Sequence, residues 1–249
     1  MRTVFITGAS SGLGRGLSLH FAKEGRTVFA AARRKDELSK LAAEAPQGSI
    51  VPVPLDVQDS EALVRAIHRA EEEAGGALDL VIANAGIGQP TSARKMDWQV
   101  VKRIMDVNVT AACVTIAAAL PKMIERNAGH VVAVSSLAAF RGMPGNASYC
   151  ASKAALHVWM ESVRVDLRST QVRATTIYPG FVKTEMTAKN KFPMPLLMEL
   201  DAAVRVMARG LARGARTISF PLPMSALTRT LGVIPGALYE PLAGKVRMF

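Results

Sequence analysis

The chain has 249 residues, of which 49% are hydrophobic and 20% are charged, and it contains no low-complexity tract, so we expect one folded domain over residues 1–249 and no extended disorder. Its formal net charge of +11 is compatible with acidic ligands, but the Lys and Arg residues are dispersed and aromatic residues make up only 5%. These features argue against nucleic-acid binding, and we expect no nucleic-acid partner.

Targeting and metal-binding signals are missing from the sequence. The first residues, Met-Arg-Thr-Val-Phe-Ile-Thr-Gly, predict a strand that enters a turn and lack the features of a signal peptide. No apolar stretch reaches transmembrane length without Gly, Pro or a charged residue. Cys113 and Cys150 show no disulfide or metal spacing, and the four histidines lack partners at ligand spacing. We therefore expect a soluble, cytoplasmic protein without a metal site.

Short apolar stretches alternate with helical patterns along the chain. The predicted strands are 3–7, 27–32, 50–55, 78–83, 130–135, 172–178 and 216–220. The predicted helices are 12–24, 35–44, 60–74, 97–127, 148–170 and 199–212. Strands that are nearly all Val, Ile and Ala and are joined through helices imply parallel pairing with both faces covered. We predict an α/β fold: one doubly wound Rossmann-type domain with a mostly parallel seven-stranded sheet.

A glycine-rich turn follows the first predicted strand and opens the first predicted helix, in the run Thr7-Gly8-Ala-Ser-Ser-Gly12-Leu-Gly14. Glycine tolerates the tight turn and lets backbone N–H groups approach a pyrophosphate at the start of a helix. The turn therefore predicts a dinucleotide site. Two interpretations of Thr7, Ser10 and Ser11 stay open: they bind phosphate oxygens, or they make turn and capping hydrogen bonds.

Arg33 and Arg34 follow the second predicted strand. In dinucleotide-binding folds this place carries the acidic residue that binds the ribose 2′-hydroxyl of NAD. The acid is absent here, and an arginine fork suits the 2′-phosphate of NADP, so we predict NADP(H) as the cofactor. The alternative is that the arginines only begin a basic helix. Arg15 either reinforces phosphate binding or faces solvent.

Tyr149 and Lys153 lie four residues apart in a predicted helix, so their side chains share one face. A phenol with a pKa near 10 needs that pKa lowered by about three units, or about 4 kcal/mol, to act as an acid or base near neutrality. An ammonium about 4 Å away at an effective dielectric near 20 supplies energy of that order. We therefore predict that Lys153 lowers the pKa of Tyr149.

Several motifs in one order resemble the short-chain dehydrogenase/reductase family, from the glycine-rich turn to about Gly214. The matching motifs are Thr7-Gly8-x-x-x-Gly12-x-Gly14, Asp56-Val57, Asn84-Ala85-Gly86, the four residues Asn108, Ser136, Tyr149 and Lys153, and Pro179-Gly180 with Thr184. The chain departs from the family at Ala83, where Asn is frequent, and at Ala139, where Gly is frequent.

The resemblance implies hydride transfer between a nicotinamide and a carbonyl or secondary alcohol, with Tyr149 as general acid/base. It implies that Ser136 hydrogen-bonds the substrate oxygen, that Lys153 also holds the nicotinamide ribose, and that Asn108 binds a water linking Lys153 to solvent. Family spacing favours Ser136 over the adjacent Ser135. The predicted cofactor contacts are Gly8, Ser10, Ser11, Gly12, Leu13, Gly14, Arg33, Arg34, Asp56, Val57, Asn84, Ala85, Gly86, Tyr149, Lys153, Pro179, Gly180, Val182 and Thr184.

Residues 183–198 occupy the family's variable substrate loop. Their apolar side chains are Met186, Phe192, Met194, Leu196, Leu197 and Met198. These residues either form an adaptable wall for a hydrophobic ketone, aldehyde or alcohol, or pack against the core or a neighbouring subunit. The two interpretations remain open.

The tail, residues 220–249, contains four prolines among apolar residues, with cations interspersed. We expect a pair of short helices that pack on the domain or a subunit, a substrate lid, or a contact with a membrane surface. By resemblance we expect a homodimer or homotetramer formed through residues 106–126 and 148–170. Two alternative functions are a non-catalytic NADP-binding regulatory protein and a membrane-peripheral dehydrogenase of lipid-like substrates.

Overall fold

The structure, a computed structural model, describes residues 2–190 and 192–244. Seven strands form one sheet in the order β3-β2-β1-β4-β5-β6-β7, and every strand pair is parallel. The strands are β1 (Thr3–Thr7), β2 (Thr27–Ala32), β3 (Ile50–Pro54), β4 (Leu80–Ala83), β5 (Gly129–Val134), β6 (Val172–Pro179) and β7 (Thr217–Phe220). The predicted seven-stranded, doubly wound sheet is confirmed.

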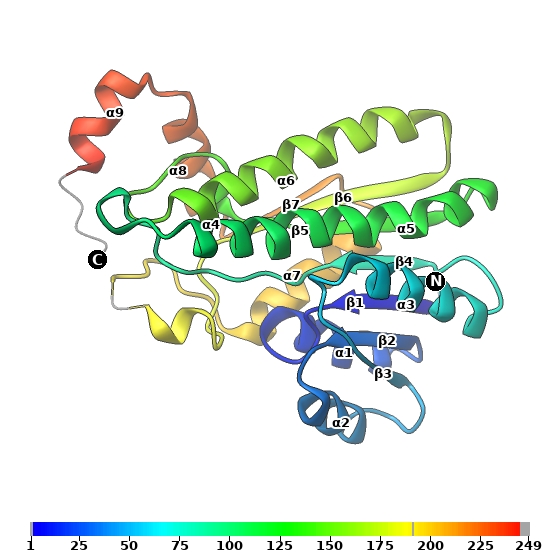
Figure 1. Cartoon of the computed structure of the whole chain (residues 1–249). Helices are drawn as coiled ribbons and strands as arrows, with labels where there is room; N and C mark the ends of the chain where they lie inside the picture. Colours follow the sequence, from blue (N-terminus) through cyan, green and yellow to red (C-terminus); the bar gives the residue numbers. More distant parts are fainter. Residues whose placement is uncertain (1, 191, 245–249) are drawn as a thin grey trace.

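Helices cover both faces of this sheet (Figure 1). The α-helices are α1 (Gly12–Lys23), α2 (Lys35–Glu44), α3 (Ser60–Glu73), α4 (Trp98–Met105), α5 (Ala111–Glu125), α6 (Ala147–Asp166), α7 (Leu200–Ala212), α8 (Leu222–Val233) and α9 (Gly236–Ala243). Short 3₁₀ turns are η1 (Ala93–Lys95), η3 (Leu137–Ala139), η4 (Leu167–Ser169) and η5 (Thr187–Lys189). Helices α1, α2 and α7 pack on one face, and α3, α5 and α6 on the other.

The core has two halves because successive strand residues point to opposite faces. Val4 and Ile6 of β1 pack with Leu17 of α1 in one buried cluster, whereas Phe5 packs with Ile116 of α5 in the other. Full burial of each such side chain contributes about 1.5–3 kcal/mol. Both halves of the core hold the sheet, and with it the turns at the strand ends, in place.

The strand order reverses at β1. The chain proceeds from β1 through β2 to β3 on one side, and from β4 to β7 on the other. In open α/β sheets the crevice at such a reversal, outside the carboxyl ends of the strands, is the place where ligands bind. The ends of β1 and β4 therefore mark the candidate site.

The prediction of one uninterrupted α-helix over residues 97–127 is wrong in its middle. A π-helical segment, η2 (Asp106–Thr110), separates α4 from α5, and the Ala111 N–H donates to the carbonyl of Asp106, five residues back. Such insertions occur frequently at functional sites because they shift the side chains that follow. Here the insertion contains the buried Asn108.

The same stretch, Trp98–Glu125, has the length and hydropathy of a membrane span, with a mean hydropathy of 1.6 in its most apolar window. Charged residues at both ends and Pro121 interrupt these 28 residues, in keeping with the expectation that Gly, Pro or a charge breaks every such stretch. Its buried members Ile116, Ala119 and Met123 belong to the core against the sheet. Core packing accounts for the apolar composition of this helix.

A buried ion pair joins α3 to α5. The carboxylate of Glu71 is fully buried, and the Nζ atom of the half-exposed Lys122 lies 3.1 Å from its Oε2. Within the described chain neither oxygen of this carboxylate has a hydrogen-bond partner. Lys122 therefore supplies the compensating charge for Glu71.

We predict that Lys122→Met lowers the free energy of unfolding by about 2–4 kcal/mol, because it leaves the buried carboxylate unpaired. The double variant Glu71→Leu/Lys122→Met should lose clearly less than Lys122→Met alone, since no uncompensated charge remains. Urea unfolding of the wild type, both single variants and the double variant measures the coupling. Additive losses would contradict this account.

Candidate active site

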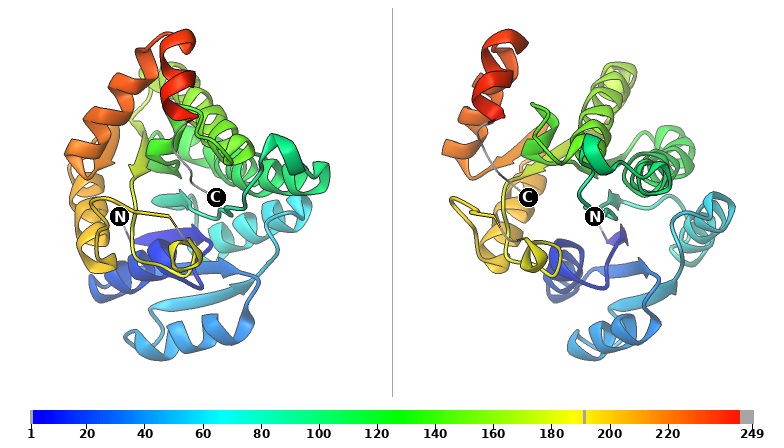
Figure 2. Two further views of the ribbon diagram at one scale, coloured as in Figure 1. Left: turned by 90° about the vertical axis from the view of Figure 1, so that its left-hand side faces the viewer. Right: turned by 60° about the vertical axis from the view of Figure 1, so that its left-hand side comes forward.

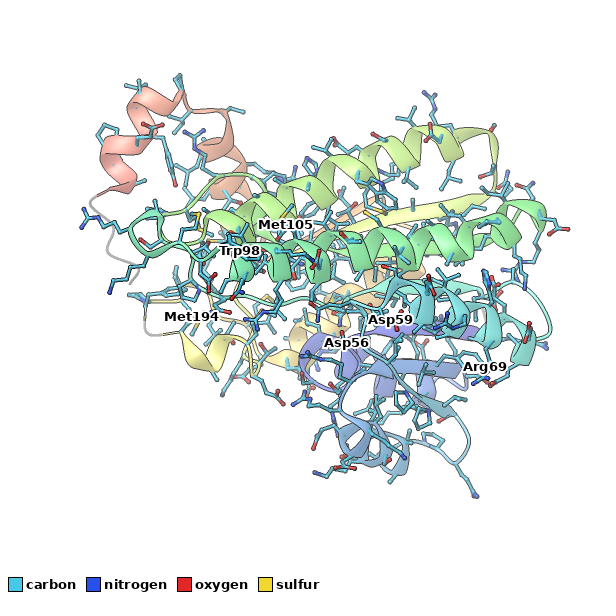
Figure 3. All side chains as sticks on the ribbon, viewed as in Figure 1. Asp56, Asp59, Arg69, Trp98, Met105 and Met194 are labelled. Atoms are coloured by element: carbon cyan, nitrogen blue, oxygen red, sulfur yellow. The ribbon has the colours of Figure 1, made fainter. Side chains whose placement is uncertain are left out.

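The segments that follow the strands gather at one end of the molecule, which is at the left in Figure 1 and faces the viewer in the left part of Figure 2. The segment after β6 and the helices α8 and α9 lie there. Figure 3 places Trp98, at the start of α4, and Met194, on the segment after β6, at this same end. Segments that are far apart in the chain therefore meet at the same end of the sheet, where the predicted site residues can lie close together.

The start of α6 is held by a residue from a distant loop. The Ser148 N–H donates to the Thr91 hydroxyl at 3.0 Å, and the Thr91 N–H donates to the Gly145 carbonyl at 2.7 Å. This cap fixes the helix one residue before Tyr149, and a lost cap costs about 1 kcal/mol. A cap from a remote segment leaves no local pattern, so the sequence alone does not point to Thr91.

Ser136 lies close enough to the Tyr149 phenol to lower its pKa, in opposition to burial. The Ser136 hydroxyl also accepts from the Ala138 N–H at 3.1 Å and donates to the Pro179 carbonyl at 3.4 Å. The adjacent Ser135 is buried and donates to the Lys153 carbonyl at 2.9 Å. Ser136, and not Ser135, therefore faces the phenol, as the spacing argument expected.

The effect predicted for Lys153 on the pKa of Tyr149 is wrong for this structure. Burial raises the pKa of Tyr149, and the neighbouring Ser136 opposes that shift. The Lys153 Nζ lies 5.8 Å from the centre of the Tyr149 ring and donates to the Val134 carbonyl at 2.9 Å. Burial also lowers the pKa of Lys153 to about 8, so its ammonium loses its proton closer to neutrality than an exposed lysine does.

Asn108 is fully buried in the π-helical segment, and its amide is bonded on both sides. Its Oδ1 accepts from the Ile87 N–H at 2.8 Å, while its Nδ2 donates to the Ile87 carbonyl and the Ser152 hydroxyl, both at 3.0 Å. A Cβ on Gly86 would lie 3.4 Å from both the Asn108 Oδ1 and the Lys153 Nζ. Asn108 thus holds the chain beside Gly86 and Lys153, and its expected binding of a water stays a prediction.

The ends of β1 and β4 are tied together by Thr7 and Asn84. The Thr7 hydroxyl accepts from the N–H groups of Asn84 and Ala85 at 3.0 and 3.1 Å, and the Asn84 side chain donates to the carbonyls of Thr7 and Gly8 at 2.9 and 3.3 Å. Of the two interpretations of Thr7, the structure supports the turn-forming one. The motif Asn84-Ala85-Gly86 steadies the glycine-rich turn.

The glycine-rich turn fits a dinucleotide phosphate. Gly8 and Gly12 have φ angles of +69° and +52°, and a Cβ on Gly8 or Gly14 would collide with backbone or with Asn84. Ser11 is the N-cap of α1 and makes no side-chain capping bond in this structure, which leaves the first N–H groups of α1 for an anion. Leu13 packs at the edge of the core.

Each predicted selector arginine has a carboxylate partner. The Arg33 Nη1 lies 3.9 Å from the Asp56 Oδ2, and the Arg34 Nη1 lies 2.9 Å from the Glu185 Oε2. The Arg34 Nε also donates at 3.2 Å to the hydroxyl of Ser10, a residue of the glycine-rich turn. Both arginines therefore reach the cofactor end of the sheet, and Glu185, which no motif in the sequence indicates, is a neighbour of Arg34.

Two further residues singled out in the sequence, Val57 and Arg15, take no part in the pairs made by Arg33 and Arg34. Val57 follows Asp56 and is buried in the core below the phosphate end. Arg15 pairs with Glu44 of α2, so its guanidinium is engaged by a helix carboxylate. Of its two interpretations, this pairing disfavours a freely solvated side chain, and phosphate binding stays a prediction.

The chain after β6 crosses to the glycine-rich turn. The Gly180 N–H donates to the Phe220 carbonyl at 2.7 Å, and the buried Val182 forms a bridge with Met198. A Cβ on Gly12 would lie 3.2 Å from the Thr184 methyl group. Pro179, Gly180, Val182 and Thr184 therefore lead from the Ser136 side of the site to the phosphate turn.

Comparison with known proteins identifies the family of this chain. Residues 2–193 match the short chain dehydrogenase family. This chain is a member of the short-chain dehydrogenase/reductase family. An uncharacterized oxidoreductase of Myxococcus xanthus (strain DK1622) is 52% identical over 248 residues, covering 99% of this chain and 98% of the relative. The chain is accordingly an oxidoreductase.

Solved structures agree with the fold. A short chain dehydrogenase from Burkholderia cenocepacia J2315, in complex with NADP, matches with a TM-score of 0.82 and 28% identity over 97% of this chain and 99% of that one. A short chain dehydrogenase/reductase from Burkholderia phymatum, in complex with NAD, has a TM-score of 0.84 and 21% identity, with 92% of each chain covered. The dehydrogenase described here thus has a nicotinamide-cofactor fold.

The substrate-loop residues of this dehydrogenase divide between surface and core. Met186, Leu196 and Leu197 are exposed by 44%, 52% and 43%, whereas Met198 packs against the core. A Cβ on Gly88 would lie 3.8 Å from the Tyr149 ring and 3.9 Å from the Met186 Sδ. Met186 therefore reaches the neighbourhood of Tyr149, and Met198 anchors the end of the loop.

The predicted pair of short tail helices is confirmed as α8 and α9, although residues 245–249 lie outside the described part. The Arg229 guanidinium of α8 stacks on Phe140 at 4.2 Å, and the Arg141 guanidinium stacks on Tyr239 of α9 at 4.1 Å. The Tyr239 hydroxyl donates to the Gly142 carbonyl at 2.7 Å. The tail of this dehydrogenase is thereby attached to the loop between Ser136 and Tyr149.

The burial of Lys153 predicts a pH-dependent stability. Between pH 8 and 10.5 the unfolded chain binds a proton at Lys153 that the folded protein does not, so stability from this group increases with pH through that window. Relative to Lys153→Met, the wild type should gain on the order of 3 kcal/mol between those limits. Urea unfolding of both proteins across this range measures the difference. A difference that stays constant with pH would contradict it.

Proposed function

We propose that this protein is an NADP(H)-dependent oxidoreductase that interconverts a carbonyl and a secondary alcohol, with Tyr149 as general acid/base. The observation that carries this proposal is the proximity of Ser136, Tyr149 and the buried Lys153, at the same end of the sheet as the glycine-rich turn. When bound, the nicotinamide supplies or accepts the hydride.

The side chains divide the work on the substrate oxygen. In reduction, the Tyr149 hydroxyl donates its proton to the carbonyl oxygen, and the Ser136 hydroxyl donates a hydrogen bond where negative charge develops. Lys153, whose Nζ is held by the Val134 carbonyl, would bind the ribose of the cofactor. Asn108 positions the chain at Gly86, which adjoins the Lys153 Nζ.

The proposal of NADP(H) over NAD(H) is supported by Arg33 and Arg34, which lie where an acidic residue would bind the ribose of NAD. Their guanidinium groups are exposed by 66% and 45% of the side chain, so a phosphate has access to them. The link between Arg34 and Ser10 brings one of these cations to the glycine-rich turn. Ser10 would then contact the same phosphate.

A hydrophobic substrate is supported by Met186, which is exposed and lies near Tyr149, and by the exposed Leu196 and Leu197 of the same loop. The attachment of α8 and α9 to the loop after Ser136 favours the tail as part of the substrate side of the site. Exposed Leu222 and Leu238 on these helices leave a subunit or membrane contact as further proposals for the tail. A homodimer or homotetramer likewise remains a proposal by family resemblance.

We predict that Tyr149→Phe lowers turnover by at least about 100-fold, since the proton donor is lost. NADPH binding should change by less than about twofold, because the ring remains. A panel of ketones, aldehydes and secondary alcohols, followed by NADPH absorbance, measures turnover, and fluorescence titration measures binding. Ser136→Ala should reduce kcat more than Ser135→Ala, whose hydroxyl faces the Lys153 backbone. Turnover retained in Tyr149→Phe would overturn the proposed mechanism, and so distinguish it from a regulatory role.

We predict that the wild type binds NADPH more tightly than NADH, and that Arg34→Ala weakens NADPH binding by about tenfold or more through the loss of a charge-assisted contact. NADH binding should stay the same. Arg26→Ala is the matched control, because Arg26 pairs with Glu24 at the opposite end of β2 and α1. Calorimetric titrations of the wild type and both variants with NADPH and NADH measure these affinities. Equal affinity for the two cofactors would remove both arginines from the specificity argument.

A further inference from the structure

Three consecutive residues after β6, which we call the strap (Thr184, Glu185 and Met186), reach three parts of the site. The Thr184 methyl group lies against Gly12 of the phosphate turn, and the Met186 Sδ lies near Gly88 beside Tyr149. Between them, the Glu185 carboxylate binds Arg34. One short segment thus spans from the predicted phosphate selector to the phenol.

The charge environment of Arg34 is defined by two contacts. Its Nε donates to Ser10 at 3.2 Å, and its Nη1 lies 2.9 Å from the Glu185 Oε2. The neighbouring Arg33 is 3.9 Å from Asp56, beyond hydrogen-bonding distance. Of the two selector arginines, Arg34 therefore has the closer and better-paired carboxylate.

An anion that binds Arg34 competes with the Glu185 carboxylate for the same guanidinium group. A 2′-phosphate carries about −1.5 to −2 charges near neutrality, so a carboxylate a few ångströms away opposes its binding. A nucleotide without that phosphate leaves the pair of Arg34 and Glu185 intact. Glu185 therefore weakens the binding of nucleotides that carry a 2′-phosphate and leaves the binding of the others unchanged.

We propose that Glu185 is a specificity-determining residue that competes with the cofactor 2′-phosphate for Arg34 and so moderates the preference for NADP(H). The inference rests on the proposed NADP(H) function. A phosphate that binds Arg34 displaces the Glu185 carboxylate. Because Glu185 lies between Thr184 and Met186, this displacement changes the position of the strap beside Tyr149. Binding and strap position are then linked reciprocally.

The test uses adenosine 2′,5′-bisphosphate and 5′-AMP as probes, because they differ only in the 2′-phosphate. Glu185→Gln should bind the bisphosphate on the order of tenfold more tightly than the wild type, the effect of removing one unit charge about 4 Å from a phosphate of about −1.5 to −2 charges in a water-like dielectric. Binding of 5′-AMP should stay the same. The gain should shrink at 0.5 M salt, because salt screens charges at this exposure.

Glu199→Gln is the matched control. Glu199 is an exposed carboxylate paired with Lys183 of the same segment at 3.2 Å, so the control removes the same charge without touching Arg34. It should bind both probes as the wild type does. An equal gain in Glu199→Gln would assign the effect to the overall charge and overturn the inference.

The remaining outcomes separate the two proposals. If the wild type prefers the bisphosphate but Glu185→Gln binds it no more tightly, or more weakly, the competition by Glu185 is overturned and the NADP(H) proposal stands. If both the wild type and Glu185→Gln bind the two probes equally, the NADP(H) proposal fails and the inference fails with it. Calorimetric titration at low and high salt measures all of these affinities.

Discussion

The close approach of the backbone at the ends of β1 and β4 is the constraint on which the site depends. Two N–H groups of the β4 end donate to the Thr7 hydroxyl, and the Asn84 amide donates back to the carbonyls of β1 and the turn. Gly8 approaches Ala85 so closely that a Cβ would meet its Cα at 2.8 Å. These contacts fix the shape of the phosphate turn and the direction of α1.

The same constraint extends to the reacting side chains. Once Asn84 is fixed, the chain continues to Gly86 and Ile87, and Asn108 binds the backbone of Ile87 through both ends of its amide. Gly86 then lies next to the Lys153 Nζ. A hydrogen-bonded series therefore connects the phosphate turn to α6, and a change at either end alters the geometry of the other.

Desolvation, more than the spacing of charges, sets the proton affinities in this site. An ammonium on the same helix face as a phenol lowers the phenol pKa only if its charge lies near the phenol and burial does not disfavour the charged forms of the two groups. Here Lys153 is buried and bonded to the end of β5, so burial lowers its own pKa to about 8 and raises that of Tyr149. The helix register was right, but the environment reversed the expected shift.

Local patterns in the sequence were sufficient for the sheet, the order of its elements, the glycine-rich turn and the shared helix face of Tyr149 and Lys153, whereas Ser136 was identified from the family resemblance. Apolar periodicity and glycine conformation depend on near neighbours in the chain, so the sequence by itself determined these features. Tertiary structure alone decided the π-helical segment at Asn108, the cap that Thr91 places on α6, the contact of Glu185 with Arg34, and the reversed shift at Tyr149. Each of these depends on residues brought together from distant segments and on their burial, neither of which has a local signature.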